Sequence, residues 1–65
     1  MNYLEIDKKV QEYQNSGNFS HEQLKEIRKG IQEDIDVRGY AKDSIPAEEM
    51  FNKRWELIIK RNSNS

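Results

Sequence analysis

Residues 19–40, FSHEQLKEIRKGIQEDIDVRGY, carry the strongest helix signals of the chain. This stretch opens on a helix start signal. Ser20 at the N-cap position is followed three residues later by Gln23, so that each side chain can bond a free backbone N–H near the other. Phe19 and Leu24 flank this pair at the spacing of a hydrophobic staple. Apolar side chains then recur every three or four residues, which predicts a helix with one buried face formed by Leu24, Ile27, Ile31 and Ile35.

Two features of this stretch require an explanation. Gly30 lies inside the predicted helix, where glycine costs about 1 kcal/mol relative to alanine. Either the backbone of another helix comes close at Gly30, or the helix weakens there. The second feature is an acidic exit, because acidic residues at a helix C-terminus oppose the helix dipole. We expect Asp36 or Asp34 to cap a short helical turn over residues 37–41, with Val37 and Tyr40 on one face of it.

The segment before this stretch predicts a first helix over residues 3–15. Asn2 is placed to cap its start, and Gly17 is expected to end it in the left-handed conformation that glycine adopts easily. The buried face of this helix is expected to consist of Tyr3, Ile6, Val10 and Tyr13.

The segment after it predicts a third helix that begins near Ile45 and Pro46, because proline is tolerated only in the first helical turn. Lys60 and Arg61 suit its C-terminus. We therefore expect a single helical domain over residues 1–61 and a disordered polar tail over residues 62–65. The third helix has an unusually broad apolar face: Met50, Phe51, Trp55, Leu57, Ile58 and Ile59.

Composition excludes several classes of protein. The chain has 65 residues and a net charge of −1, so it makes one small domain without a general attraction for nucleic acid or membrane. It has no cysteine and hence no disulfide or thiolate metal site. Its N-terminus lacks the basic and apolar runs of a signal peptide, and its longest apolar run, residues 57–59, is far too short to span a bilayer. We expect a small all-α, three-helix protein in the cytoplasm.

The second and third predicted helices are related at an offset of 26 residues. This offset aligns Phe19 with Ile45, Leu24 with Met50, Arg28 with Arg54, and Ile31 with Leu57. The pattern indicates an internal repeat whose second copy is degenerate. Chance similarity between two amphipathic helices is the alternative interpretation.

A longer run carries a resemblance: Phe19, Glu22-Gln23-Leu24, Glu26-Ile27-Arg28, Gly30-Ile31, Ile35-Asp36-Val37 and Tyr40-Ala41. It is similar to a repeat of uncharacterised proteins from Gram-positive bacteria and their mobile elements, with the form F-x-x-x-Q-M/L-x-x-I-R-x-G-L-x-x-G-L-D-V-s-x-Y-A. The resemblance covers about a third of the chain. It departs at Asp34, where the family usually has glycine, and in the third helix. No catalytic activity is known for this repeat, so the resemblance implies a helical module and no reaction.

No set of residues in the sequence proposes a reaction, a metal or a cofactor. His21 is the only histidine, and neither a zinc site nor a catalytic triad can be built around it and Ser20 from sequence. Glu33, Asp34 and Asp36 lack the spacing of a calcium loop and are better interpreted as a capped, solvated acidic rim. We therefore predict a protein that is not an enzyme, with no catalytic residues and no bound metal or cofactor.

The basic residues leave two interpretations open. Clusters on the second and third helices could contact nucleic acid, but acidic residues alternate with them. Arg28 and Arg54 recur at the repeat offset and could contact a partner's carboxylate or a phosphate. We favour a structural role in which each reaches back to an acidic group of its own chain, with Asp36 the expected partner of Arg28.

The broad apolar face of the third helix is the best candidate for binding. One helix pair cannot cover all of it, although a core position is the default for large aromatic side chains. The expected partner interface is Phe51, Trp55, Ile58 and Ile59. The sequence therefore favours a non-enzymatic protein-interaction module that binds another protein or a second copy of itself, with a small accessory protein of a phage or other mobile element as its setting. A nucleic-acid-binding regulator that uses the basic residues is the alternative.

Overall fold

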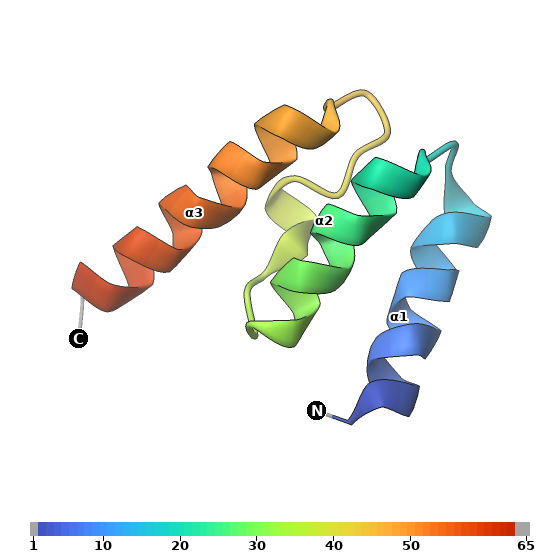
Figure 1. The fold of residues 1–65 in the computed structure, drawn as a ribbon, viewed down its shortest axis with the longest axis horizontal. Coiled ribbons are helices and arrows are strands. Elements are labelled where there is room, and N and C mark those ends of the chain that lie inside the picture. Colours follow the sequence, from blue (N-terminus) through green and yellow to red (C-terminus); the bar gives the residue numbers. More distant parts are fainter. Residues whose placement is uncertain (1, 64–65) are drawn as a thin grey trace.

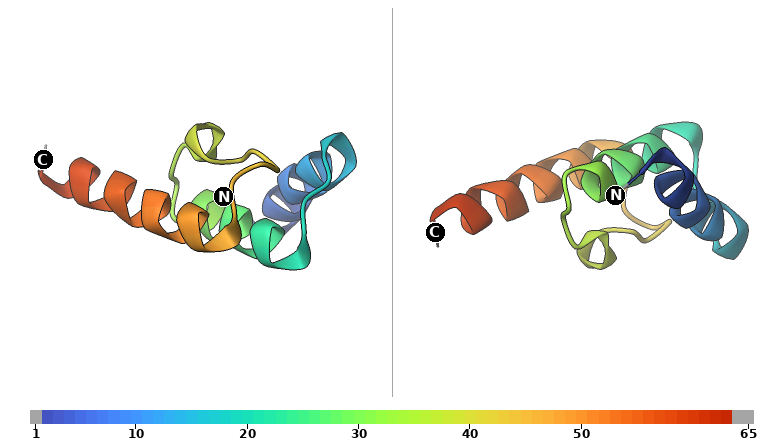
Figure 2. Two further views of the ribbon diagram at one scale, coloured as in Figure 1. Left: turned by 90° about the horizontal axis from the view of Figure 1, so that it is seen from above. Right: turned by 90° about the horizontal axis from the view of Figure 1, so that it is seen from below.

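Three helices and one short turn make up the protein in a computed structural model that describes residues 2–63. Helix α1 covers Tyr3–Ser16, α2 covers His21–Gln32, the 3-10 turn η1 covers Val37–Gly39, and α3 covers Ala47–Ser63. Helix α2 lies between α1 and α3 in one layer, and η1 lies against one face of this layer (Figures 1 and 2). The molecule is accordingly flat, measuring 35 × 27 × 14 Å. The predicted all-α fold, with a short turn between the second and third helices, is confirmed.

The start of α2 shows the predicted capping box. The Ser20 Oγ accepts a hydrogen bond from the Gln23 backbone N–H at 3.1 Å, and the Gln23 side-chain carbonyl accepts one from the Ser20 N–H at 2.7 Å. The Gln23 amide nitrogen also donates to the backbone carbonyls of Asp43 and Ile45, at 3.0 and 2.7 Å. Gln23 is therefore buried, and it ties the segment before α3 to the start of α2. The capping pattern did not predict this second role.

The end of α2 uses an aspartate where helices usually use glycine. Asp34 has a φ of 59°, the left-handed conformation. Its N–H donates to the Ile31 carbonyl and the next N–H, of Ile35, donates to the Gly30 carbonyl, which together form a Schellman motif. Gly17, where the left-handed residue of the first helix was expected, is extended instead, with a φ of −157°. Asp43 explains this, because its carboxylate accepts the Asn18 N–H at 3.2 Å and thereby helps to hold the extended link between α1 and α2.

Replacement of Asp34 by glycine is expected to raise the free energy of unfolding by about 0.5–1 kcal/mol. Glycine adopts the left-handed conformation without the steric cost of a Cβ, and the substitution removes a carboxylate from the C-terminal end of α2. Urea denaturation followed by circular dichroism measures the change. Asp34→Ala is the matched control, because it removes the carboxylate but keeps the Cβ. An equal gain in Asp34→Ala would show that charge, and not backbone conformation, is responsible.

The turn η1 is capped as predicted. The Asp36 carboxylate accepts the Arg38 backbone N–H at 3.2 Å and two bonds from the Arg38 guanidinium, each at 2.8 Å. These bonds from Arg38 lower the pKa of Asp36 to about 2. The acidic exit of α2 is thus the start of the next element. The turn brings Val37 and Tyr40 into the core, where they are 5% and 0% exposed.

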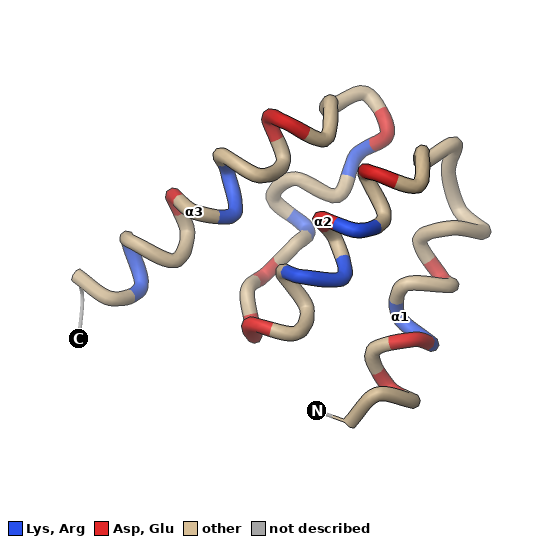
Figure 3. Tube along the Cα trace, in the orientation of Figure 1, with Lys and Arg blue, Asp and Glu red and all other residues tan. Residues whose placement is uncertain are grey.

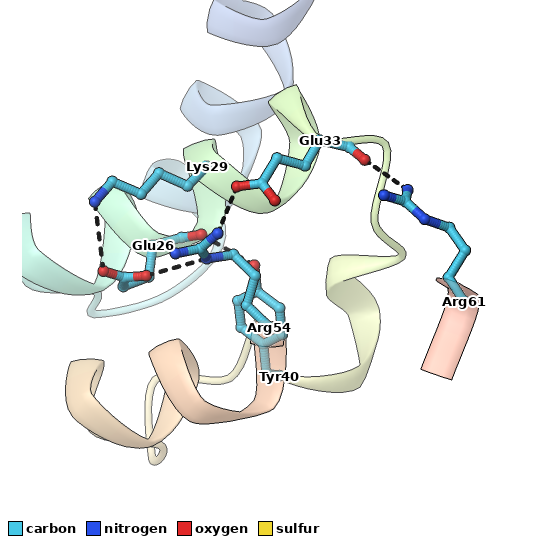
Figure 4. Close-up of polar contacts among 6 residues, drawn as sticks. All are labelled: Glu26, Lys29, Glu33, Tyr40, Arg54 and Arg61. Atoms are coloured by element: carbon cyan, nitrogen blue, oxygen red, sulfur yellow. Dashed lines mark hydrogen bonds and ion pairs between the residues drawn. The ribbon is translucent and has the colours of Figure 1, made fainter. Parts of the chain in front are cut away.

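Gly30 has no side chain because the side chains of Val37 and Tyr40 approach α2 at this position. The expectation that the backbone of another helix comes close at Gly30 is wrong. A Cβ at Gly30 would lie 2.5 Å from the Val37 Cγ1 and would overlap the Tyr40 hydroxyl. The Tyr40 hydroxyl donates to the Glu26 backbone carbonyl at 3.0 Å (Figure 4). The absence of a side chain at Gly30 therefore leaves the space that the Tyr40 hydroxyl occupies against α2.

Burial raises the pKa of the Tyr40 hydroxyl to about 12. The unfolded chain releases this proton near pH 10, so the contribution of Tyr40 to stability is complete below pH 10 and is lost as the pH rises towards 12. We expect the free energy of unfolding, measured by urea denaturation at successive pH values, to fall across this interval. The free energy of unfolding of the Tyr40→Phe variant should fall less steeply over the same pH interval. Deprotonation of the lysines affects both proteins alike. Equal slopes for the two proteins would contradict the assignment to Tyr40.

Helix α3 begins one residue later and ends two residues later than the sequence predicts. Pro46 precedes the helix, and its carbonyl accepts the Met50 N–H at 2.9 Å. At the other end, Asn62 and Ser63 were expected in the disordered tail but are helical. Asn64 and Ser65, the rest of the predicted tail, lie outside the described residues. The C-terminal turns of α3 extend past the end of α2 (Figure 1).

The core lies where α2 meets its three neighbours. Ile27, Tyr40 and Met50 are the largest side chains buried completely, and each fully buried apolar side chain of this size contributes about 1.5–3 kcal/mol. Tyr3 was expected on the buried face of the first helix but is 76% exposed, because it lies in the first turn of α1 beside the N-terminus. The cluster of buried core residues consists of Ile6, Val10, Ile27, Ile31, Val37, Tyr40 and Met50.

Candidate protein-interaction surface

Three large apolar side chains form a row on the outside of α3. Phe51, Trp55 and Ile59 follow one another at intervals of four residues, which places them on one face of the helix. They are 43%, 45% and 63% exposed. We name this row the α3 stripe. The Phe51 and Trp55 rings meet at an angle of 63° with centroids 6.3 Å apart, so the two aromatic residues form one continuous apolar surface.

The sequence placed Ile58 in the same interface, but the structure places it in the core. Ile58 is 8% exposed and belongs to the neighbouring row of α3, together with Met50 and Arg54, which are also buried. This row points toward α2 because residues four apart share a helix face. The predicted interface therefore divides into a buried residue, Ile58, and an exposed α3 stripe.

Arg54 lies on the inner border of the α3 stripe, and its side chain is only 5% exposed. Its guanidinium donates to the Glu33 carboxylate at 2.5 Å and forms an ion pair with the Glu26 carboxylate at 3.4 Å, without hydrogen-bond geometry (Figure 4). The guanidinium carbon also lies 5.5 Å from the centroids of the Phe51 and Trp55 rings. Arg54 therefore joins the aromatic part of the α3 stripe to Glu26 of α2 and to Glu33, the residue that follows α2.

Arg28, the residue aligned with Arg54 in the sequence, has a different partner from the one expected. It forms an ion pair with Asp7 of α1, while Asp36 is bonded to Arg38. Asp36 prefers Arg38 because the two residues are only two positions apart and share a capped turn. The structural interpretation of both arginines agrees with these contacts, since Arg28 joins α1 to α2 and Arg54 joins α3 to α2.

Glu26 and Glu33 are the site residues that sequence reasoning missed. The sequence places Glu33 in a solvated acidic rim, and Glu26 among the acidic residues that alternate with the basic ones. The available signal was their spacing around Gly30: residues 26, 30 and 33 share one helix face, and a glycine inside a helix indicates that another part of the chain comes close to that face. Arg61 adds to the same junction, because its guanidinium donates to the Glu33 backbone carbonyl at 2.8 Å.

The other candidate chemistry gains no support from the described residues. His21 is exposed at the first position of α2. Within residues 2–63, no group of three or more histidine, aspartate or glutamate side chains is placed to hold a metal ion. A surface hollow of about 580 Å³ lies between α1 and the segment after α2, with Tyr13 and Ile35 in its wall and the Asp36–Arg38 ion pair at its edge. Five large apolar side chains are exposed among the described residues: Phe51, Trp55 and Ile59 lie together in the α3 stripe, and Tyr3 and Leu4 lie at the start of α1.

Comparisons with protein-family models, curated proteins and solved structures give no match for this chain. In the part of the chain that the structure describes, no helix has the length and apolar character needed to cross a bilayer. The inference of function therefore depends on the surface of the molecule.

Proposed function

We propose that this chain is a non-enzymatic protein-interaction module that binds its partner through the α3 stripe. The observation that supports this function best is the exposure of Phe51, Trp55 and Ile59 in a chain whose supply of apolar residues is small. A 65-residue domain needs its large side chains for its own core. Leaving two aromatic rings at the surface is therefore costly unless another molecule covers them.

The α3 stripe also has the chemistry of an energetic centre in an interface. Aromatic side chains bury a large area and often dominate binding energy. Contact with the Arg54 guanidinium restricts the Phe51 and Trp55 rings before any partner binds. Side chains that are ordered in advance lose less conformational entropy on binding, which increases affinity.

Binding of nucleic acid has less support. Several basic residues are engaged within the chain: Arg28 with Asp7, Lys29 with Glu26, Arg38 with Asp36, Arg54 with Glu26 and Glu33, and Arg61 with the Glu33 carbonyl. Basic and acidic positions also alternate along all three helices (Figure 3). A surface of this kind has little of the accumulated positive charge that attracts phosphates. An accessory role in a phage or other mobile element is the setting that the sequence resemblance suggests for the proposed module.

Site-specific photo-crosslinking in the cells from which the chain comes tests this function. A photoreactive phenylalanine analogue at position 51 should give a protein adduct, whether the partner is another protein or a second copy. The same analogue at position 25, an exposed residue of α2, is the matched control. The adduct should disappear when Ile59→Ser and Trp55→Ser are added. These substitutions are on the surface, so circular dichroism should show a folded protein. Equal adducts at positions 51 and 25, or none at 51, would contradict the proposal.

A further inference from the structure

The outer border of the α3 stripe is acidic. Glu48, Asn52 and Glu56 form a second row at intervals of four residues, and all three are exposed. Each lies three residues before a member of the α3 stripe, so the two rows run side by side along the helix. The apolar surface is therefore bordered on this side by two carboxylates and one amide.

The inner border carries two guanidiniums, and both are bonded within the chain. Arg54 is paired with the carboxylates of Glu26 and Glu33. Arg61 lies seven residues further along the same row and donates to the Glu33 backbone carbonyl. The Glu33 side chain is still 39% exposed, so its negative charge faces solvent at this border. Two carboxylates therefore line the outer border of the three apolar side chains, while the charged groups of the inner border are bonded within the chain.

From this arrangement we infer that the α3 stripe binds a basic amphipathic helix of another protein, an inference that depends on the proposed function of the α3 stripe. The stripe spans eight residue steps, or about 12 Å of helix. A partner helix matches this length with apolar residues at positions i, i+4 and i+7. Lysine or arginine beside that apolar row would face Glu48 and Glu56 on the outer border, which is complementary in charge.

The same charges argue against two other occupants. In an antiparallel symmetric pair, a second copy of the chain would bring its own Glu48 and Glu56 opposite the first pair, so like charges would face each other. Nucleic acid would bring phosphates toward the carboxylates. A basic helix is the occupant for which both the apolar and the charged groups find partners.

Trp55 provides the measurement, because it is the only tryptophan of the chain and lies in the centre of the proposed site. The probe is a capped synthetic peptide of about 14 residues, four helical turns, with leucine on one face, lysine on both borders of that face and no tryptophan. The control peptide has the same sequence with glutamate in place of lysine. We expect the lysine peptide to shift the Trp55 emission to shorter wavelength as the ring is buried, with weaker binding at higher salt, and the glutamate peptide to cause no shift.

Variants at the acidic border give the decisive comparison. Glu48→Gln with Glu56→Gln should weaken binding of the lysine peptide about fivefold. Glu5→Gln with Glu12→Gln, which makes the same change of net charge on α1, should leave the affinity unchanged. Equal binding of the two peptides, no binding of the lysine peptide, or equal weakening by both pairs of substitutions would overturn the inference.

One further outcome separates the two proposals. A concentration-dependent shift of Trp55 emission without peptide, together with a doubled mass in light scattering, would identify a second copy as the occupant. This result would overturn the inference of a basic helix but leave the proposed function intact, since the crosslink from position 51 would persist. Absence of that crosslink would contradict the proposed function itself.

Discussion

Replacement of Gly30 by alanine should destabilise the domain by roughly 2–4 kcal/mol. The new methyl group would overlap the Tyr40 hydroxyl and lie 2.5 Å from the Val37 Cγ1, so the turn η1 has to move away from α2. Tyr40 then loses its hydrogen bond to the Glu26 carbonyl, and its ring leaves the centre of the core. A domain of this size has a total stability of only about 3–10 kcal/mol, so urea denaturation should detect a large loss.

Two further variants make this prediction specific. Gly39→Ala is the matched control, because a Cβ at Gly39 meets no atom within 4 Å, and its stability should change by less than about 0.5 kcal/mol. In the double variant Gly30→Ala with Tyr40→Phe, the oxygen closest to the new methyl group is gone. The combined loss should therefore be smaller than the sum of the single losses. Strict additivity would show that the Tyr40 hydroxyl is not the obstacle.

Replacement of Arg54 by methionine should cost about 3–5 kcal/mol, the usual result of removing one partner from a buried ion pair. The Glu26 carboxylate, whose side chain is 13% exposed, would keep Lys29 at 4.0 Å as its remaining cation. Glu33 would lose its only side-chain bond to α3 among the described residues. Chemical denaturation measures the loss, and circular dichroism checks that each variant is still helical in the absence of denaturant.

Arg28→Met provides the comparison within the same molecule. Arg28 and Asp7 form an ion pair whose side chains are 37% and 56% exposed, so its removal should cost less than about 1 kcal/mol. Glu26→Gln added to Arg54→Met should recover part of the stability, because no buried carboxylate is then left without its guanidinium. Similar losses for Arg28→Met and Arg54→Met, or no recovery with Glu26→Gln, would contradict the burial argument.

The parts of the fold that could be predicted are those determined by residues close together in sequence. The capping box of Ser20 with Gln23 and the Asp36 cap of η1 depend on side chains two or three residues from the groups they bond. The apolar spacing of α2 was equally local, and its buried residues Ile27 and Ile31 are as expected. Local patterns of this kind determine element type and approximate boundaries.

The candidate site was predictable only in part, because its contacts join residues far apart in the chain. Helical spacing placed Phe51, Trp55 and Ile59 together, but it could not decide which side of the broad apolar face would meet α2. The burial of Ile58 and the exposure of Trp55 depend on how α3 is rotated against α2. The Arg54–Glu33 contact crosses 21 positions and depends on the same rotation.

The backbone conformation at two positions also could not be predicted from the neighbouring residues in the sequence. Gly17 has the residue type of a left-handed helix end, but the link to α2 is extended. Asp34 is less favourable than glycine in the left-handed conformation, and the Schellman motif imposes this conformation. In both cases the path of the chain to the next element outweighs the preference of the single residue.

The central place of α2 has a consequence for how the molecule opens. Helix α2 packs against α1, α3 and η1. Detachment of α1 uncovers one side of α2 and leaves the contacts with α3 and η1 in place. Amide hydrogens of α1 should therefore exchange with solvent through partial opening, whereas those of α2 should exchange only when the whole domain unfolds. A partner bound on α3 would slow exchange in α3 and α2 while α1 continued to open at its own rate.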